Sequence, residues 1–110
     1  MPRQAQAMDP LDRLEATIRA RRDADPDGSY TASLFARGRA KIAQKVGEEA
    51  TETVIAALAE PAKLTAEAAD LVFHLLVLLA DAGLGLDDVR AELARREGVS
   101  GHVEKATRQS

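Results

Sequence analysis

The stretch that decides the fold of this chain is residues 41–70, KIAQKVGEEATETVIAALAEPAKLTAEAAD. It begins with charged side chains, continues through an apolar segment, is interrupted at Pro61, and then presents a second acidic pair. Because proline cannot continue the interior of a helix, the stretch predicts two helices that are joined by a short turn. Helices joined by a short turn pack as antiparallel neighbours, so we expect a helical hairpin at the centre of the molecule.

Two acidic pairs stand in this stretch, each with a spacing of three residues. Glu49 and Glu52 form the first pair, and Glu67 and Asp70 form the second. Residues three apart share a helix face, so an antiparallel hairpin could aim all four carboxylates at one point. Carboxylates that lie so close repel one another unless a cation neutralises them. We therefore predict a Mg²⁺ site, because hard oxygen ligands without histidine or cysteine suit this ion.

A Mg²⁺ site of this kind predicts chemistry on a phosphate ester or anhydride. The ion is typically shared between one or two protein carboxylates and the phosphates of a substrate, and it neutralises charge on the leaving group. A carboxylate that does not bind the metal could orient or deprotonate the attacking water. Glu48, Glu49 and Glu52 are the candidates for this role, and which of them is the base stays open. Glu48 could also bind the metal.

Lys41 and Lys45 lie one turn apart and lead directly into the first acidic pair. An ammonium group serves as a point charge for phosphate, so both are candidate contacts to a polyphosphate. The alternative is ordinary ion pairing on the surface with the neighbouring glutamates, in which case the acidic residues would simply form a solvated helix face.

The two histidines and the basic end of the chain give less specific signals. His74 follows Asp70 by one turn, and it could be a proton shuttle, a partner that orients a carboxylate, or a histidine whose hydrogen bonds are satisfied inside the bundle. His102 offers no specific argument. The basic C-terminal region is usually a solvated chain end but could close over an anionic substrate. Its residues are Arg95, Arg96, Lys105 and Arg108.

Composition limits the class of protein. The 110 residues suit one domain, and with 45% apolar but only 3% aromatic residues the core must consist of aliphatic side chains, which favours an all-α fold. The formal charge of −3 provides no basic field for nucleic acid or an anionic membrane. The chain lacks cysteine, an apolar run of ~20 residues and a signal-peptide pattern, so we expect a soluble cytoplasmic protein.

Further helices are predicted around the hairpin, within a single domain over residues 1–110. We expect helices at 10–22, at 30–37 with Thr31 as the cap, at 39–60 after a bend at Gly38, at 62–81, and at 87–96 with Val89 and Leu93 pointing inward. Residues 1–8 are expected to be flexible, and 98–110 to form a polar tail.

The run LVFHLLVLL (71–79) is apolar around the full circumference of its helix. Such a helix needs more neighbours than one small chain supplies. We therefore predict a helical bundle of four to five helices per chain whose core is completed by a second copy in a homodimer.

Longer segments of the chain resemble a known family. They are SYTASLFARGRAKIAQKVGEEATETVIAALAE (29–60), EAADLVFHLLVLLADAGLGLDDV (67–89) and SGHVEKATR (100–108). These segments resemble the phosphoribosyl-ATP pyrophosphohydrolase family and, more broadly, the all-α nucleotide pyrophosphohydrolases that include MazG-type enzymes. The ExxE and ExxD pairs of that superfamily fall here on Glu49, Glu52, Glu67 and Asp70, and Glu48 completes an EExxE form.

The resemblance implies Mg²⁺-dependent hydrolysis of the α–β phosphoanhydride of phosphoribosyl-ATP by a homodimeric helical protein. The products would be phosphoribosyl-AMP and pyrophosphate, in the second step of histidine biosynthesis. Some relatives are fused to a cysteine-dependent cyclohydrolase, so we expect the free-standing form here. Two alternatives stay open: a MazG-like pyrophosphatase that clears non-standard nucleoside triphosphates, and a non-catalytic helical dimer whose acidic face binds a partner protein.

Overall fold

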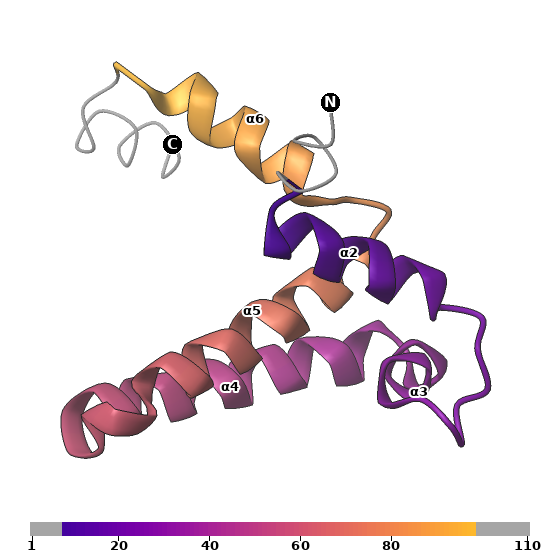
Figure 1. Ribbon diagram of the computed structural model, residues 1–110, viewed down its shortest axis with the longest axis horizontal. Coiled ribbons are helices and arrows are strands. Elements are labelled where there is room, and N and C mark those ends of the chain that lie inside the picture. Colours follow the sequence, from indigo (N-terminus) through magenta and orange to yellow (C-terminus); the bar gives the residue numbers. More distant parts are fainter. Residues whose placement is uncertain (1–7, 99–110) are drawn as a thin grey trace.

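The computed structural model describes residues 8–98, and every regular element among them is helical (Figure 1). The predicted all-α class is therefore confirmed, and the helix boundaries differ from the predicted ones by at most two residues. Predictions for residues 1–7 and for the tail, including His102, Lys105 and Arg108, lie outside the described residues. The elements are α2 (Pro10–Ala20), α3 (Tyr30–Arg37), α4 (Arg39–Ala59), the 3₁₀ turn η1 (Pro61–Lys63), α5 (Leu64–Asp81) and α6 (Leu86–Arg96).

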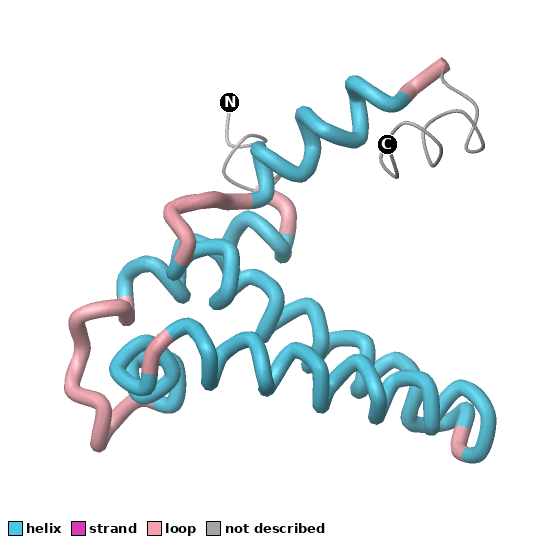
Figure 2. Tube along the Cα trace, turned by 180° about the vertical axis from the view of Figure 1, so that it is seen from behind, coloured by secondary structure: helices cyan, strands magenta, loops and turns pink. Residues whose placement is uncertain are grey.

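The predicted hairpin is the longest feature of the molecule. The helices α4 and α5 run antiparallel and make more contacts with each other than any other two elements do. Pro61 ends α4 as predicted and begins the 3₁₀ turn that reverses the chain. In Figure 2, the closed end of the hairpin at η1 projects away from α2 and α3. One half of the hairpin is therefore embedded in the rest of the fold. The other half, which ends at η1, is not covered by other helices of residues 8–98, and we call it the open arm.

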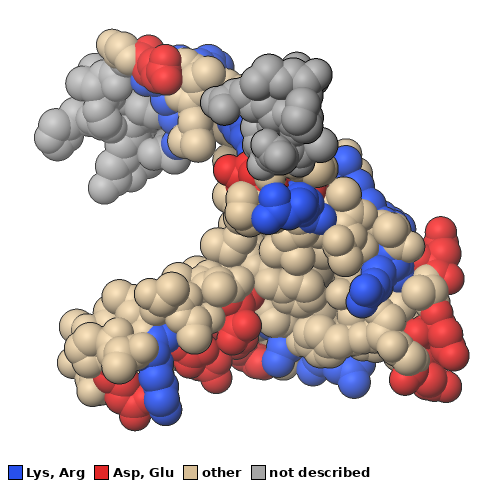
Figure 3. Space-filling model, in the orientation of Figure 1, with Lys and Arg blue, Asp and Glu red and all other residues tan. Residues whose placement is uncertain are grey.

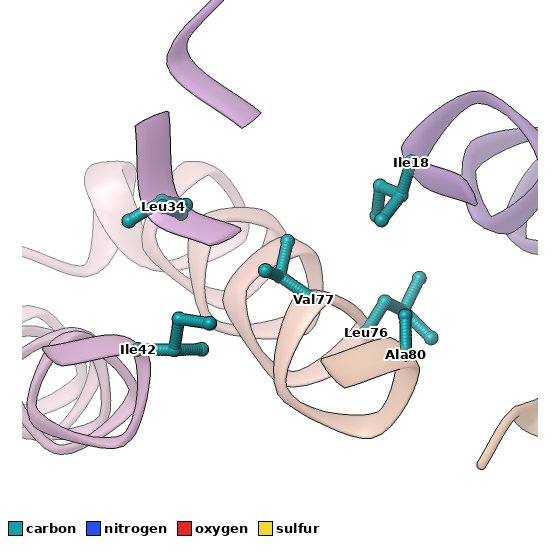
Figure 4. Close-up of a cluster of buried hydrophobic side chains, with 6 residues drawn as sticks. All are labelled: Ile18, Leu34, Ile42, Leu76, Val77 and Ala80. Carbon is teal, nitrogen blue, oxygen red and sulfur yellow. The ribbon is translucent and has the colours of Figure 1, made fainter. Parts of the chain in front are cut away.

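The core lies at the embedded end of the hairpin, where four helices meet (Figure 4). Each fully buried aliphatic side chain stabilises the fold by about 1.5–3 kcal/mol relative to an exposed one. Ile18 from α2, Leu34 from α3 and Ile42 from α4 are at most 1% exposed. They pack against Leu76, Val77 and Ala80 of α5.

The apolar helix α5 is only partly covered by this one chain. Its buried residues are His74, Leu76, Val77 and Ala80, whereas Leu75 is 41% exposed. Within residues 8–98, no single helix is long and apolar enough to cross a bilayer. The segment Pro61–Asp81 satisfies the criteria of length and composition only together with α6, from which it is bent by 100°. The predicted homodimer stays a prediction.

Gly38 forms the bend between α3 and α4, as predicted, but the cap of α3 was wrongly assigned. The backbone of Gly38 has φ +96°, a conformation that residues with a Cβ rarely adopt. The N-cap of α3 is Ser29, whose hydroxyl accepts a hydrogen bond from the Ala32 N–H at 3.1 Å. Thr31 lies inside the first turn instead and is buried. Both residues are possible caps by type, and the backbone conformation selects the earlier one.

The helix α6 leaves the hairpin and is joined to α2 by polar contacts. Glu15 accepts a hydrogen bond from the Leu86 N–H at 2.7 Å, and Arg90 pairs with Asp12 at 2.9 Å. The prediction that Val89 and Leu93 point inward is wrong for this chain, because they are 38% and 58% exposed. Helical periodicity shows which residues share a face, but not whether the same chain supplies a surface to cover that face.

Candidate active site on the α4–α5 hairpin

The hairpin brings the two predicted acidic pairs to one side, which we call the acidic face (Glu49, Glu52, Glu67 and Asp70). Glu52 on α4 and Asp70 on α5 both lie close enough to Glu49 to raise the pKa of its carboxyl. Glu52 and Glu67 line the same hollow of about 120 Å³ between the helices. In Figure 3, acidic side chains gather along the lower edge of this arm, and basic ones follow toward α3.

These carboxylates are neighbours, but they do not converge tightly. Among residues 8–98, no three acidic or histidine side chains come together in a group that could hold a metal ion. Helix spacing predicts which carboxylates share a side of the hairpin, whereas their side-chain rotamers decide whether the oxygens meet. The assignment of the four as metal ligands therefore stays a prediction.

Glu49 has the most unfavourable electrostatic environment on the acidic face. Burial raises the pKa of its carboxyl, and the hydrogen bond and repulsion from Glu52 raise the pKa further. His74 lowers the pKa, and Asp70 raises it. A carboxylate in such surroundings is stabilised by a nearby positive charge, either a proton or a cation.

Within residues 8–98, no salt bridge reaches Glu49, Glu52 or Asp70. Lys63 and Glu67 line the same hollow. The Lys63 ammonium, however, pairs with Glu60 at 2.8 Å. Carboxylates that lack a protein cation are free to take one from solution. The sequence did not single out Lys63, although its place just after Pro61 puts it at the closed end of the hairpin.

Glu48 joins a surface network and not the Glu49–Glu52 pair. Its carboxylate accepts hydrogen bonds from Gln44 Nε2 at 2.7 Å and from Lys45 Nζ at 3.2 Å, which lower its pKa. Glu48 in turn raises the pKa of the Lys45 ammonium. The surface pairing that the sequence left open for Lys45 is thus present in the structure. Lys41 contributes weakly to the same network, through its attraction for Glu48.

His74 has both of its ring nitrogens hydrogen-bonded and is only 5% exposed. Nδ1 lies 2.8 Å from the Asp70 carbonyl oxygen, and Nε2 lies 2.8 Å from the Tyr30 hydroxyl. Because a carbonyl oxygen can only accept, Nδ1 must donate to it, and Nε2 is left as the partner of the Tyr30 hydroxyl. Of the three roles that the sequence left open, the histidine satisfied inside the bundle matches these contacts.

Tyr30 is the site residue that sequence reasoning missed. Its ring stacks on Phe73 with centroids 6.1 Å apart, and its hydroxyl lies near enough to Lys45 to raise the pKa of that ammonium, after the larger effect of Glu48. A signal was available, since a tyrosine hydroxyl usually finds a hydrogen-bond partner, and a histidine inside the apolar run of residues 71–79 needs one. Tyr30 is also the single tyrosine of the chain.

A family model described as phosphoribosyl-ATP pyrophosphohydrolase matches residues 11–97 of the chain. The match includes both helices of the hairpin and the whole acidic face. The chain belongs to this family. The resemblance inferred from the sequence is thereby confirmed.

Curated relatives agree with membership of the phosphoribosyl-ATP pyrophosphohydrolase family. The phosphoribosyl-ATP pyrophosphatase of Rhizorhabdus wittichii is 66% identical over 99 residues, which make up 89% of this chain and 93% of the relative. Its counterpart from Erythrobacter litoralis is 65% identical over 92% of this chain and 98% of its own length. The counterpart from Azospirillum brasilense is 60% identical over 91% of each chain.

Proposed function

We propose that this protein hydrolyses the α–β phosphoanhydride of phosphoribosyl-ATP in the second step of histidine biosynthesis. The products are phosphoribosyl-AMP and pyrophosphate. The observation that carries the proposal is the acidic face of the hairpin, where Glu52 and Asp70 lie close enough to Glu49 to raise its pKa, and no described basic side chain forms a salt bridge with these three. The phosphoribosyl-ATP pyrophosphatases that cover nearly all of the chain support the choice of substrate.

The donor set of the acidic face fits Mg²⁺. It consists of carboxylate oxygens, it carries excess negative charge, and it borders a hollow that opens to solvent. Glu52, Glu67 and Asp70 would hold the ion, and Glu49 would be a fourth ligand only while it does not act on the water. When bound, Mg²⁺ neutralises the substrate phosphates and the charge that develops on the leaving pyrophosphate.

The protein's own side chains then prepare the attacking water. Glu49 is our candidate for the base, because burial and Glu52 raise its pKa toward the range of an effective proton acceptor. Glu52, which has the largest effect on Glu49 among its acidic neighbours, would help to orient the Glu49 carboxylate. Glu48 can take part by leaving Gln44 and Lys45, and its departure would free the Lys45 ammonium for a phosphate oxygen. Lys41 is the second candidate contact to phosphate.

We also infer that the active protein is a homodimer. The open arm of the hairpin leaves large apolar side chains uncovered, with Val54, Ile55 and Leu58 being 58%, 55% and 84% exposed. Contiguous apolar surface of this kind usually marks an interface with another protein. A second copy of the chain could cover it, and sedimentation velocity would measure whether the protein has the mass of one chain or two. A cytoplasmic location, as expected from the sequence, is part of the same proposal.

The function is tested by comparing turnover of phosphoribosyl-ATP with turnover of a panel of nucleoside triphosphates, in Mg²⁺ and in EDTA. We expect release of pyrophosphate from phosphoribosyl-ATP in Mg²⁺ alone. Preference for the panel would instead indicate the MazG-like activity. The absence of turnover with any of these substrates would favour the non-catalytic dimer.

A further inference from the structure

We propose that the purine of phosphoribosyl-ATP stacks on the ring of Tyr30, and that this ring selects the substrate by favouring the positive charge of an N1-substituted adenine. The inference deepens the proposed function and rests on it for the identity of the substrate. Tyr30 is the first residue of α3 and belongs to neither acidic pair.

Tyr30 carries the one exposed benzene-type ring of the protein. The chain has one tyrosine, two phenylalanines and no tryptophan, and all three rings lie within residues 8–98. Phe35 and Phe73 pack against the core, whereas Tyr30 is 52% exposed. A nucleotide base binds readily to such a ring, because every base has a face that can stack on it.

The ring of Tyr30 is held in place on one face and at its hydroxyl. It stacks on Phe73, with centroids 6.1 Å apart and planes at 24° to each other. Its hydroxyl lies 2.8 Å from Nε2 of the buried His74. The surface that the ring leaves to solvent therefore lies on the opposite face. A side chain that is already immobilised loses little conformational entropy when a ligand binds to it.

Hydrogen bonds connect Tyr30 to the backbone of the acidic face. The His74 ring that meets the Tyr30 hydroxyl also meets the Asp70 carbonyl oxygen, at 2.8 Å through Nδ1. Asp70 and His74 are one turn apart, which is a rise of about 6 Å along α5. Base and phosphates are separated by one ribose in a nucleotide. A base on Tyr30 would thus leave its phosphates within reach of a metal ion at the acidic face.

The base of phosphoribosyl-ATP differs from ordinary adenine in its charge. A substituent on ring nitrogen N1 makes adenine a much stronger base, so the substituted ring is cationic at a pH where the adenine of ATP is neutral. The face of an aromatic side chain attracts a cation. The unpaired carboxylates of the acidic face favour the same charge, and the nearby Lys45 ammonium is balanced by Glu48 at 3.2 Å. These surroundings favour the cationic purine over neutral adenine.

Two substitutions of Tyr30 separate the ring from the hydroxyl. Tyr30→Phe and Tyr30→Leu both remove the hydrogen bond to His74, but only Tyr30→Leu removes the ring. We expect KM for phosphoribosyl-ATP to be about tenfold higher in Tyr30→Leu than in Tyr30→Phe, at similar kcat, because stacking binds substrate and transition state alike. The preference for phosphoribosyl-ATP over ATP, measured as the ratio of their kcat/KM values, should fall in Tyr30→Leu.

A purely structural role of the ring predicts a different result. It would lower the melting temperature of Tyr30→Leu and affect both substrates equally. Equal KM values for phosphoribosyl-ATP in the two variants, or an unchanged preference over ATP, would overturn the proposal.

The intrinsic fluorescence of the protein measures stacking directly and does not require Tyr30→Leu to fold. With one tyrosine and no tryptophan, the tyrosine emission comes from Tyr30 alone. The probes are 1-methyl-AMP and AMP, which differ in one methyl group and the positive charge that comes with it. We expect 1-methyl-AMP to quench the emission at a concentration at least about threefold lower than AMP. No quenching, or equal quenching by both, would contradict stacking of a cationic purine.

The two proposals fail in different ways. If the unaltered protein hydrolyses phosphoribosyl-ATP but Tyr30→Leu matches Tyr30→Phe, the stacking site fails and the proposed function stands. If phosphoribosyl-ATP is not hydrolysed but 1-methyl-AMP quenches Tyr30 selectively, the proposed function fails and the site for a cationic purine stands.

Discussion

The two ends of α5 carry acidic side chains in opposite environments. At its C-terminal end, Asp81 is paired with Arg39 at 2.9 Å and with Arg22 at 3.8 Å. The same arginines donate to the carbonyl oxygens of Asp81 and Ala80, at 3.0 and 2.9 Å. In the first half of the helix, Asp70 faces Glu49 across the hairpin, and no salt bridge among the described residues reaches either of them.

The difference separates a structural carboxylate from a candidate catalytic one. The C-terminal end of a helix favours positive charge, so Asp81 would be unfavourable there without its two arginines. With them it ties the turn after α2 and the start of α4 to the end of α5. Asp70 and its neighbours have no such compensation, and a protein keeps an unfavourable charge cluster of this kind mainly where function requires it.

The largest effect should follow from substitutions on the acidic face. Glu52→Gln and Asp70→Asn each keep the size of the side chain and remove a charge, so we expect turnover of phosphoribosyl-ATP to fall by roughly 10²- to 10⁴-fold. Circular dichroism should show an unchanged helical fold. Asp87→Asn is the control, because this side chain is 96% exposed and pairs with Arg90 on α6. Unfolding of both acidic-face variants would make the acidic face structural and remove the contrast with Asp81.

Mg²⁺ should stabilise the protein through the acidic face alone. A ligand that binds only the folded state stabilises it by about 2.7 kcal/mol at a hundred times its dissociation constant. We therefore expect a Mg²⁺-dependent rise in melting temperature for the unaltered chain and for Asp81→Asn, but not for Glu52→Gln. Equal rises in all three proteins would mean that the ion binds elsewhere.

Removing the charge at the other end should affect stability and not chemistry. Asp81→Asn leaves two arginines without their shared carboxylate, and we expect it to lower the free energy of unfolding by about 1–2 kcal/mol. The value is modest because the arginine side chains are 46% and 61% exposed and partly screened by water. Urea unfolding measures the change, and kcat of the folded enzyme should stay within about twofold of wild type. A large loss of kcat would instead connect Asp81 with catalysis.

The sequence predicted more of the scaffold than of the contacts that make it specific. The positions of proline and glycine predicted the hairpin and the Gly38 bend, because these residues act through their own backbone conformation. The bond between Tyr30 and His74 spans 44 residues and depends on how α3 packs against α5, which no local pattern encodes. For the same reason, spacing put Glu49 and Asp70 on facing sides but could not give their separation. The exposure of Val89 and Leu93 likewise depends on where α6 leaves the core.

The smallest effect concerns the metal-free protein and its dependence on pH. Burial and Glu52 raise the pKa of Glu49 above its ordinary value of 4.5, so between these two pKa values the folded chain binds more protons than the unfolded one. Stability from this group therefore rises as the pH falls through the raised pKa, and the full penalty is present at neutral pH. We expect Glu52→Gln to relieve part of it and to raise the free energy of unfolding at pH 7 by a few tenths of a kcal/mol.

This gain should shrink as the pH falls through the raised pKa of Glu49 and disappear below the ordinary pKa of 4.5. Chemical denaturation of the variant and of the unaltered chain in EDTA, at several pH values, measures the difference. Carboxylates with lowered pKa, such as Glu92, which Arg95 and Arg96 hold at about 2, lose stability on acidification in both proteins and cancel in the difference. A variant that is less stable than the unaltered chain at pH 7 would show that the charge of Glu52 stabilises the fold, as we expect for Asp81.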